Sequence, residues 1–351
     1  MKILDRILFS SKKELALFKK YILLKRKTKR LGSNEKTVFI NIYDPDDYKF
    51  YLYNFIKFFL IEGYVVYIPN SLFNFRKFNK HISNVFRENS VVLKSFPKAN
   101  LVFDDGNLSI DYFNATARLQ NKGYFIPMSS HPQMYQQNHW DRKLNTEKLY
   151  TKAILVGNFN ADYYSQINNT KFDSIPRHII YNYLLEKKIA MTLSSPKNVL
   201  NVVHEVLNFP CVFVDRTKNE IPQKHLRNFL NKFYFFLAAP GVLMPLSHNI
   251  IEAMSVGSIP ILQRNYANLF VPALSHRVNC LIFDDLNQLG NLLLEIEFLE
   301  LTLIKQMSRN TQNYYNQFLS PSAVVERIKL EYKNKNTFYL LGELSSIEKM
   351  S

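Results

Sequence analysis

The chain has 351 residues, of which 47% are hydrophobic and 21% are charged, and it carries a formal net charge of +16. This composition is typical of a globular protein and excludes a disordered or low-complexity chain. Because one hydrophobic core rarely grows past about 250–300 residues, the length favours two domains. The two cysteines, Cys211 and Cys280, lie in apolar runs, and their number excludes a disulfide scaffold and a cysteine-based zinc or iron–sulfur site.

The basic residues are concentrated at the N-terminus. Residues 1–30 hold 11 Lys or Arg and two acidic residues, which accounts for +9 of the total +16. Apolar residues lie between these charges, so residues 1–31 are predicted to form an amphipathic helix on an anionic membrane surface, with a solvated helix packed on the body as the alternative. No apolar run reaches the roughly 20 residues of a membrane span, and no signal-peptide core is present. We therefore expect a cytoplasmic protein, peripheral on the inner face of the cytoplasmic membrane.

Residues 32–148 alternate predicted strands with helices. The apolar run 36–43 predicts the first strand, and the acidic segment 44–47 after it predicts a turn and the start of a helix that ends near Gly63. Further strands are predicted at 64–69, 90–94, 100–105 and 123–128. This alternation is typical of a parallel sheet covered by helices on both faces.

The strand–helix rhythm restarts after a polar stretch around residues 140–152. Strands are predicted at 152–159, 189–195, 210–215, 233–241, 258–263 and 279–285. Helices are predicted near 175–187, 197–208, 222–231, 247–256 and 286–297, and residues 300–335 are helical and polar. We expect an α/β protein with two Rossmann-like, doubly wound domains facing a cleft, over 32–148 and 149–315, and a helical C-terminal extension over 316–351.

The segment 236–283 carries the most informative pattern. An apolar strand ends at Pro240-Gly241, where a glycine allows a sharp turn and leaves the backbone accessible. The polar residues Ser247, His248 and Asn249 then begin a helix, whose free N–H groups favour a phosphate. Glu252 follows His248 by four residues, so both lie on one helix face. The alternative is a plain helix–strand packing unit in which Glu252 is a solvated helix residue.

This segment resembles the nucleotide-sugar-binding half of GT-B glycosyltransferases, with exostosin-like enzymes as the nearest group. The matching positions are Gly241, Ser247, Glu252, Ala253, Gly257 and Pro260. The resemblance implies that Glu252 binds hydroxyls of the donor ribose or sugar, and that Ser247, His248 and Asn249 approach its phosphates. It extends to the strand end at Gly157 and Asn158, and to Arg177 as a phosphate-facing base.

Two polar elements follow strands of the expected first domain: Asp104-Asp105-Gly106 and Ser129-Ser130-His131-Pro132. Such elements are similar to those of bacterial sialyltransferase-like enzymes that use CMP-sugars. That similarity implies an Asp as general base and His and Ser elements that hold CMP, although that family places its His-Pro in the second domain. From the residues alone, Asp104 or Asp105 at a strand end is a candidate base for an acceptor hydroxyl, and His131 a contact to an acidic acceptor. The alternative is that the two carboxylates make a turn and His131 caps a loop.

Asp215 ends the predicted strand 210–215 and is followed by Arg216 and Thr217. Its carboxylate is a candidate nucleophile or donor ligand, or else it only begins a turn. The Asp44-Pro45-Asp46 segment follows the first strand and is better explained by helix capping than by metal binding. The histidines show no metal-ligand spacing, and no P-loop, GxGxxG or GxSxG pattern is present. We therefore expect no cofactor and no metal requirement, with the nucleotide-sugar as a substrate.

The sequence thus predicts a glycosyltransferase that moves a sugar from a nucleotide-sugar donor to a cell-surface glycan or glycolipid, such as lipopolysaccharide or capsule. A CMP-sugar transferase of the sialic acid or Kdo type is the alternative within this class. A basic nucleic-acid-binding protein and a catalytically silent membrane scaffold are the alternatives of other classes. Because the basic charge lies at one terminus and no RNP, KH or helix-turn-helix signature is present, we expect no nucleic-acid partner.

Overall fold

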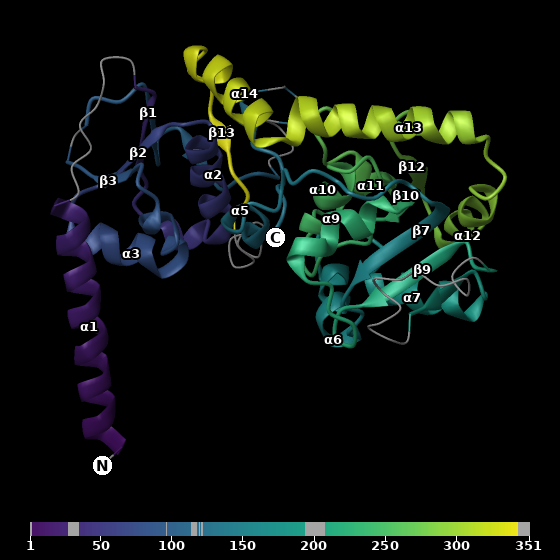
Figure 1. Cartoon of the computed structure of the whole chain (residues 1–351), viewed down its shortest axis with the longest axis horizontal. Coiled ribbons are helices and arrows are strands. Elements are labelled where there is room, and N and C mark those ends of the chain that lie inside the picture. The colour runs from purple at the N-terminus through teal and green to yellow at the C-terminus, as the bar shows by residue number, and fades with distance from the viewer. Residues whose placement is uncertain are drawn as a thin grey trace. The chain divides into compact units, whose positions relative to one another are not determined.

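In the computed structural model, the chain is described at residues 2–26, 35–95, 97–113, 118, 120, 122–193 and 208–342, with side chains in the first helix from Lys12 onward. The chain divides into two compact units (Figure 1). Unit 1 contains Met1–Ile126 and Pro321–Met350, and unit 2 contains Pro127–Ser320. Each unit is built on a parallel sheet, which confirms the α/β class with two Rossmann-like domains.

The sheet of unit 1 has the strand order β3-β2-β1-β4, and every pair is parallel. Its strands are short and apolar, and their side chains are almost all buried, as expected for strands covered on both faces. The strands are β1 (Thr37–Asn41), β2 (Val65–Ile68), β3 (Val91–Leu93) and β4 (Leu101–Asp104). All four lie within predicted strand segments.

The helices of unit 1 follow the capping signals of the sequence. Asp44 accepts a hydrogen bond from the backbone N–H of Asp46 and so begins a short 3-10 turn, as the acidic segment predicts. The helix after it ends just before Gly63, whose φ of +77° suits glycine. The helical elements are η1 (Pro45–Asp47), α2 (Phe50–Ile61), α3 (Leu72–Ile82), η2 (Val85–Arg87) and α14 (Pro321–Lys333).

The basic N-terminal helix α1 (Lys2–Arg26) packs on α3 and β3 of unit 1. Tyr21 is buried and its hydroxyl donates to Asn70 at 3.0 Å, while the Lys20 ammonium group donates to Asn79 at 2.6 Å. In contrast, Leu15 and Phe18 are about half exposed, at 55% and 46%. Among the helices described, none is both long enough and apolar enough to cross a membrane.

The sequence predicts a helical extension over residues 316–351, and the structure shows that this segment is only partly helical. After α14 the chain adds strand β13 (Phe338–Tyr339), which pairs in parallel between β5 (Leu108–Ser109) and β6 (Tyr124–Phe125). The ring of Phe338 packs edge-on against Phe103, with centroids 5.1 Å apart. This aromatic contact with the core of unit 1 explains why the segment returns to the first unit.

The sheet of unit 2 has the parallel order β12-β11-β10-β7-β9-β8. The chain first builds one side of β7 with β8 and β9, and then crosses to the other side, where β10 to β12 follow. The order therefore reverses between β7 and β10, which makes this crevice the topological switch point. The strands are β7 (Tyr150–Gly157), β8 (Ala190–Thr192), β9 (Cys211–Asp215), β10 (Phe233–Leu237), β11 (Ile259–Gln263) and β12 (Leu281–Phe283).

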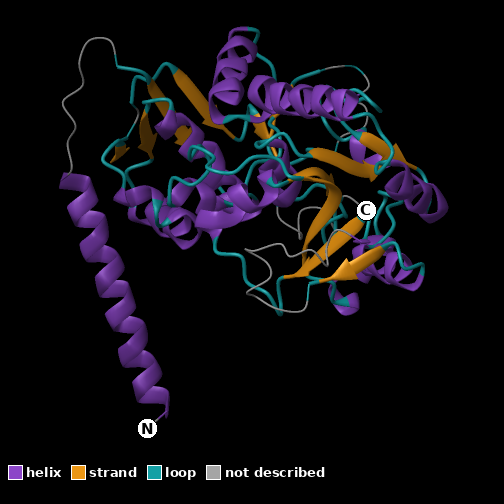
Figure 2. Cartoon of the chain, turned by 45° about the vertical axis from the view of Figure 1, so that its right-hand side comes forward, coloured by secondary structure: helices purple, strands orange, loops and turns teal. Residues whose placement is uncertain are grey.

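Helices cover both faces of this sheet (Figure 2). Ala153 and Leu155 of β7 pack on one face with residues of α7 and α12, and the alternate side chains Ile154 and Val156 are also buried. The helical elements are α5 (Pro132–Gln136), α6 (Ala161–Tyr164), η3 (Ser165–Asn169), α7 (Arg177–Glu186), α9 (Gln223–Asn231), α10 (His248–Met254), α11 (Arg264–Ala267), α12 (Leu286–Glu295), α13 (Leu301–Tyr314) and the π-helical turn η5 (Tyr315–Leu319). The helix predicted near 197–208 falls almost entirely outside the described residues.

The division between the units differs from the expected boundary near 145–151. Residues from Pro127 onward belong to unit 2. Their polar groups explain this: the backbone N–H of Asn145 donates to the side chain of Asn228 at 3.1 Å, and the hydroxyl of Thr146 donates to the Asn228 carbonyl at 3.0 Å. As a consequence His131, expected in the first domain, is part of the second unit.

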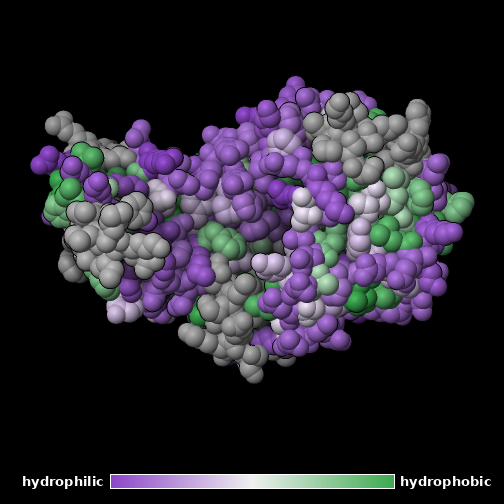
Figure 3. Space-filling model, turned by 90° about the horizontal axis from the view of Figure 1, so that it is seen from below, coloured by the Kyte–Doolittle hydropathy of each residue, from purple (hydrophilic) through white to green (hydrophobic). Residues whose placement is uncertain are grey.

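On the face drawn in Figure 3, hydrophilic residues predominate and hydrophobic residues form small, separate patches. Most of the apolar side chains described are buried, including those of Cys211 and Cys280, as predicted.

Candidate functional site

The switch point of unit 2 holds an arginine. Arg177 is the first residue of α7, and its guanidinium reaches the carboxyl ends of β7 and β10. Nη2 donates to the carbonyl oxygen of Ala239, just after β10, at 3.4 Å, and Nη1 donates to the hydroxyl of Tyr164 at 3.1 Å. A Cβ atom at Gly157, the last residue of β7, would lie 2.7 Å from Nη1. The glycine is therefore required for the arginine to occupy this place.

Arg177 is buried, with no counter-ion among the described residues. Its exposed fraction is 4%, and its Nε atom has no hydrogen-bond partner in the described part of the chain. It forms no ion pair with any carboxylate of the described residues. Its guanidinium instead lies 4.4 Å from the centroid of the Tyr164 ring, and burial lowers its pKa. Burying an unpaired cation is costly, so this position favours an anionic ligand.

A second buried charge is Glu252, in the middle of α10. Its exposed fraction is 2%, and Oε1 accepts a hydrogen bond from the backbone N–H of His131 at 3.0 Å. Burial raises the pKa of Glu252 to about 7, against the opposing effects of that hydrogen bond and of the Arg216 charge. The carboxyl group is therefore poised near its titration midpoint at neutral pH, a property that is concentrated at functional sites.

Two histidines lie beside Glu252. The rings of His131 and His248 meet edge to face, with centroids 5.4 Å apart. His248 Nδ1 lies 2.6 Å from the carbonyl oxygen of Ser129, so this nitrogen carries the proton and Nε2 is an acceptor in the neutral ring. Burial lowers the pKa of His248 to about 4. The Nδ1 atom of His131 accepts from the Gln133 backbone N–H at 3.3 Å, which leaves its Nε2 as the donor.

The end of β9 supplies the neighbouring charges. Asp215 pairs with Gly157 across the two strands, and its Oδ1 accepts hydrogen bonds from the backbone N–H and the hydroxyl of Thr217, at 3.0 and 2.7 Å. The carboxylate thus begins a turn. The next residue, Arg216, is exposed, and its charge helps to lower the pKa of His131 after the larger effect of burial.

The other predicted donor-binding residues have internal partners. The backbone N–H of Ser247 donates to the Tyr266 hydroxyl at 3.0 Å, and the Asn249 amide donates to the Val156 carbonyl at 2.7 Å. Asn158 accepts from the backbone of Asn160 at 2.9 Å. At Gly241 a Cβ atom would lie 2.7 Å from the Met244 carbonyl oxygen, so the glycine permits a tight loop. These residues position β7, α10 and the loop between β10 and α10.

The predicted carboxylates of the first half lie in unit 1. Asp104 ends β4 beside Asn41 of β1, and its Oδ1 accepts from the backbone N–H of Gly106 at 2.9 Å. Both oxygens of Asp105 accept from the backbone N–H of Tyr43, at 3.0 and 3.3 Å. Both carboxylates therefore stabilise the loops at this strand end. Asp104 Oδ2 accepts no hydrogen bond from the described residues.

The structure gathers Arg177 and Gly157 at one point of unit 2, and His131, His248 and Glu252 at another.

Sequence reasoning missed Tyr164 and Tyr266, which support Arg177 and Ser247, because aromatic residues in helical segments look like core residues. It also passed over Arg216, although its place directly after a strand end was the available signal. Within the described residues, no group of three or more His, Cys, Asp or Glu side chains is arranged to hold a metal ion.

No protein-family model matches this sequence, and a search of curated proteins found no match. Solved structures do match. A sucrose-phosphate synthase from Thermosynechococcus elongatus is 12% identical, over 85% of this chain and 99% of its own, with a TM-score of 0.43. A glycosyltransferase from Rickettsia africae is 10% identical, over 86% and 99%, with a TM-score of 0.44. Anabaena HepE in complex with UDP is 12% identical, over 85% and 100%, with a TM-score of 0.41.

With these identities and TM-scores, the likeness to solved structures assigns no activity.

Proposed function

We propose that this chain is a GT-B type glycosyltransferase, and that unit 2 binds its nucleotide-sugar donor. The single observation that carries the proposal is the buried guanidinium of Arg177, which has no carboxylate partner among the described residues and lies at the switch point of a doubly wound sheet. Ligands of such sheets bind at that crevice, outside the carboxyl ends of the strands. A diphosphate or monophosphate placed there supplies the charge that Arg177 lacks.

Glu252 is proposed to bind hydroxyl groups of the donor. A carboxylate accepts hydrogen bonds from two neighbouring hydroxyls, and a buried carboxylate does so more strongly than an exposed one. Oε1 of Glu252 is already held by the backbone of His131, so the side chain has a fixed position before the donor arrives. The position of Glu252 in the segment that resembles exostosin-like enzymes supports the same role.

The chemical step needs a base or nucleophile, and we propose Asp104 ahead of Asp105. The second oxygen of Asp104 is available to an acceptor hydroxyl, whereas both oxygens of Asp105 accept from Tyr43. Asp215 is a further candidate for a donor contact, since only its Oδ1 is engaged by Thr217. The nucleotide-sugar is a substrate in this scheme, and the resemblance to GT-B enzymes implies that no metal is required.

A CMP-sugar transferase is the second candidate, and the position of His131 favours it. The bacterial enzymes of this type hold CMP with a His-Pro element in the second domain, and His131-Pro132 belongs to unit 2. His131 lies beside Glu252 and presents Nε2 as a donor, which is a suitable group for a single phosphate. The two candidates differ in the number of phosphates that the site accepts.

We further propose that the acceptor is a cell-surface glycan or glycolipid reached at the inner face of the cytoplasmic membrane. Helix α1 supports this, because Leu15, Phe18 and Leu23 are exposed between basic residues. Deletion of residues 1–30 is expected to abolish co-sedimentation with vesicles of phosphatidylglycerol and phosphatidylethanolamine. Vesicles of phosphatidylcholine alone serve as the control, and equal sedimentation of the full and shortened chains would exclude this role for α1.

The donor site is tested by thermal unfolding with UDP-, GDP- and CMP-sugars in buffer that contains EDTA. A ligand that binds only the folded chain raises the melting temperature, so one class of nucleotide-sugar is expected to stabilise the protein. The variant Glu252→Ala is expected to lose that shift, and the exposed Glu326→Ala in unit 1 to keep it. Stabilisation that is unchanged in Glu252→Ala would refute the donor-site assignment. A shift with CMP-sugars alone would select the second candidate.

A further inference from the structure

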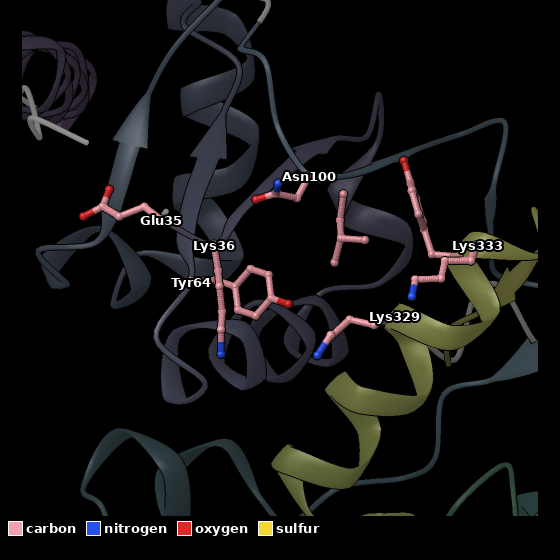
Figure 4. A pocket seen from close by; sticks show the side chains of 8 residues that line it. Glu35, Lys36, Tyr64, Asn100, Lys329 and Lys333 are labelled. Carbon is pink, nitrogen blue, oxygen red and sulfur yellow. The ribbon is translucent and has the colours of Figure 1, made fainter. Parts of the chain in front are cut away.

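Unit 1 contains a pocket at the amino edge of its sheet, about 520 Å³ in volume (Figure 4). It is bounded by the residues that precede or begin β1, β2 and β4, and by the last turns of α14. Its lining residues are Glu35, Lys36, Tyr64, Asn100, Leu101, Lys329, Tyr332 and Lys333. Nucleotides and substrates of doubly wound sheets bind at the carboxyl edge, so this pocket is separate from the sites discussed above.

Three ammonium groups line the pocket. Lys36 lies with its Nζ 5.6 Å from the centroid of the Tyr64 ring, and neither Lys36 nor Lys333 forms an ion pair within the described residues. Lys329 donates to both oxygens of Glu326 at 2.7 Å. The carboxylate of Glu35 points away from the three lysines (Figure 4). The pocket therefore has an excess of positive charge.

Neutral donors complete the lining. Asn100 accepts from the backbone N–H and the hydroxyl of Thr37, at 2.8 and 2.9 Å, both through Oδ1, so its NH2 group remains as a donor. Tyr64 is buried, and its hydroxyl points into the pocket (Figure 4). Burial raises the pKa of Tyr64, so the hydroxyl stays protonated and can donate. Hydroxyl and amide donors beside lysines are the groups that bind phosphates and sugar oxygens.

The pocket is held in shape by the return of the chain to unit 1. Helix α14 is anchored by the buried residues Val324, Val325 and Ile328, and its residues Lys329 and Lys333 share one face because they are four positions apart. Tyr332 fixes the same turn, since its hydroxyl accepts from the backbone N–H of Val102 at 3.0 Å. The lysines of α14 thus face the amino edge of the sheet on a rigid element.

We propose that this pocket binds a small phosphorylated sugar as a second ligand of the protein. Its volume lies in the range of small-molecule sites, of roughly 300–1,000 Å³, and exceeds the need of a single phosphate ion. The lysines bind the phosphate as point charges, and Tyr64 and Asn100 donate to sugar oxygens. The proposal is independent of the donor site, because no residue is shared between the two.

The first test is titration calorimetry of the full chain with glucose 6-phosphate, inorganic phosphate and glucose. We expect glucose 6-phosphate to bind, and the double variant Lys36→Ala/Lys333→Ala to bind it about tenfold or more weakly, the loss expected when charge-assisted contacts are removed. The control is Lys224→Ala/Lys305→Ala, which removes the same charge from exposed helix positions of unit 2. Equal binding by both double variants, or no binding by the natural chain, would overturn the proposal. Equal affinity for inorganic phosphate would overturn the assignment of a sugar.

A second test keeps the natural sequence. Glucose 6-phosphate is expected to slow the acetylation of Lys36 and Lys333 by acetic anhydride, read residue by residue by mass spectrometry, and to leave Lys305 unchanged. Labelling of Lys36 and Lys333 that is unaffected at saturating ligand would place the ligand elsewhere and refute the proposal.

Discussion

The carboxyl edges of the two sheets hold polar residues in contrasting states. In unit 1, Asp105 is exposed and both its oxygens accept from the backbone N–H of Tyr43. In unit 2, Arg177 and Glu252 are almost completely buried, and neither has an ion-pair partner in the described chain. The same topology therefore holds a loop-stabilising carboxylate in unit 1, and in unit 2 two buried ionisable groups with no ion-pair partner among the described residues. A buried charge without a partner destabilises the unliganded protein, so such charges indicate a ligand-binding site.

The largest effect is expected at Arg177. Replacing it by Met removes the charge proposed to bind the donor phosphate and should weaken donor binding by about a thousandfold, or ~4 kcal/mol. Because the guanidinium is buried and has no ion-pair partner within the described ranges, the unliganded variant should unfold at no lower a denaturant concentration than the natural chain. Calorimetry with the stabilising nucleotide-sugar and urea unfolding measure the two quantities.

The matched control is Arg264→Met. Arg264 is exposed in unit 2 and is paired with Asp284, at 2.7 Å, so its loss should leave donor affinity unchanged. If Arg177→Met and Arg264→Met bind the donor equally well, the buried Arg177 contributes no more to donor binding than the exposed Arg264, and its proposed role is wrong.

The second largest effect is expected in the pH dependence of the free energy of unfolding, through the ionisation of Glu252. Its pKa is raised from 4.5 to about 7 in the folded chain, so the folded state binds more protons than the unfolded state between these values. The stabilisation is fully present below pH 4.5 and is lost as the pH rises through 7, a change of up to about 3 kcal/mol. Glu252→Gln should lack this loss. Urea unfolding at pH 5 and pH 8 tests it, and an identical pH dependence in both chains would show that Glu252 is not a desolvated carboxyl group.

The smallest effect is expected in unit 1. Asp105→Asn should cost about 1 kcal/mol of stability, because the amide has one acceptor oxygen in place of two for the Tyr43 backbone. Donor binding should not change. A loss of donor affinity in Asp105→Asn, measured in the same calorimetric assay, would mean that the edge of unit 1 is more than a loop-stabilising region.

The repeating strands of both sheets could be predicted from the sequence, since runs such as 210–215 and 258–263 are apolar, bounded by turn residues and buried on both faces. Strand β13 could not, because two residues carry no periodic pattern and Phe338 is placed by its contact with Phe103. His131 was assigned to the wrong half because its link to Glu252 is a single backbone hydrogen bond across 121 positions of the chain.

The residues of the candidate site could be predicted from the sequence, but their burial and their ion pairing could not. Glu252, Arg177 and Gly157 were indicated by spacing and resemblance. Their burial, and the absence of a carboxylate beside Arg177 in the described residues, follow only from the packing of Tyr164, Ala239 and α10. Desolvation is a property of the folded environment, so no local pattern reports it.

The most direct measurement is a crystal structure of the chain with the nucleotide-sugar that stabilises it most. The donor phosphate is expected within hydrogen-bond distance of the Arg177 guanidinium, with a ribose or sugar hydroxyl on Glu252. A nucleotide bound at any other place, with Arg177 still unpaired, would contradict the assignment of unit 2 as the donor-binding unit.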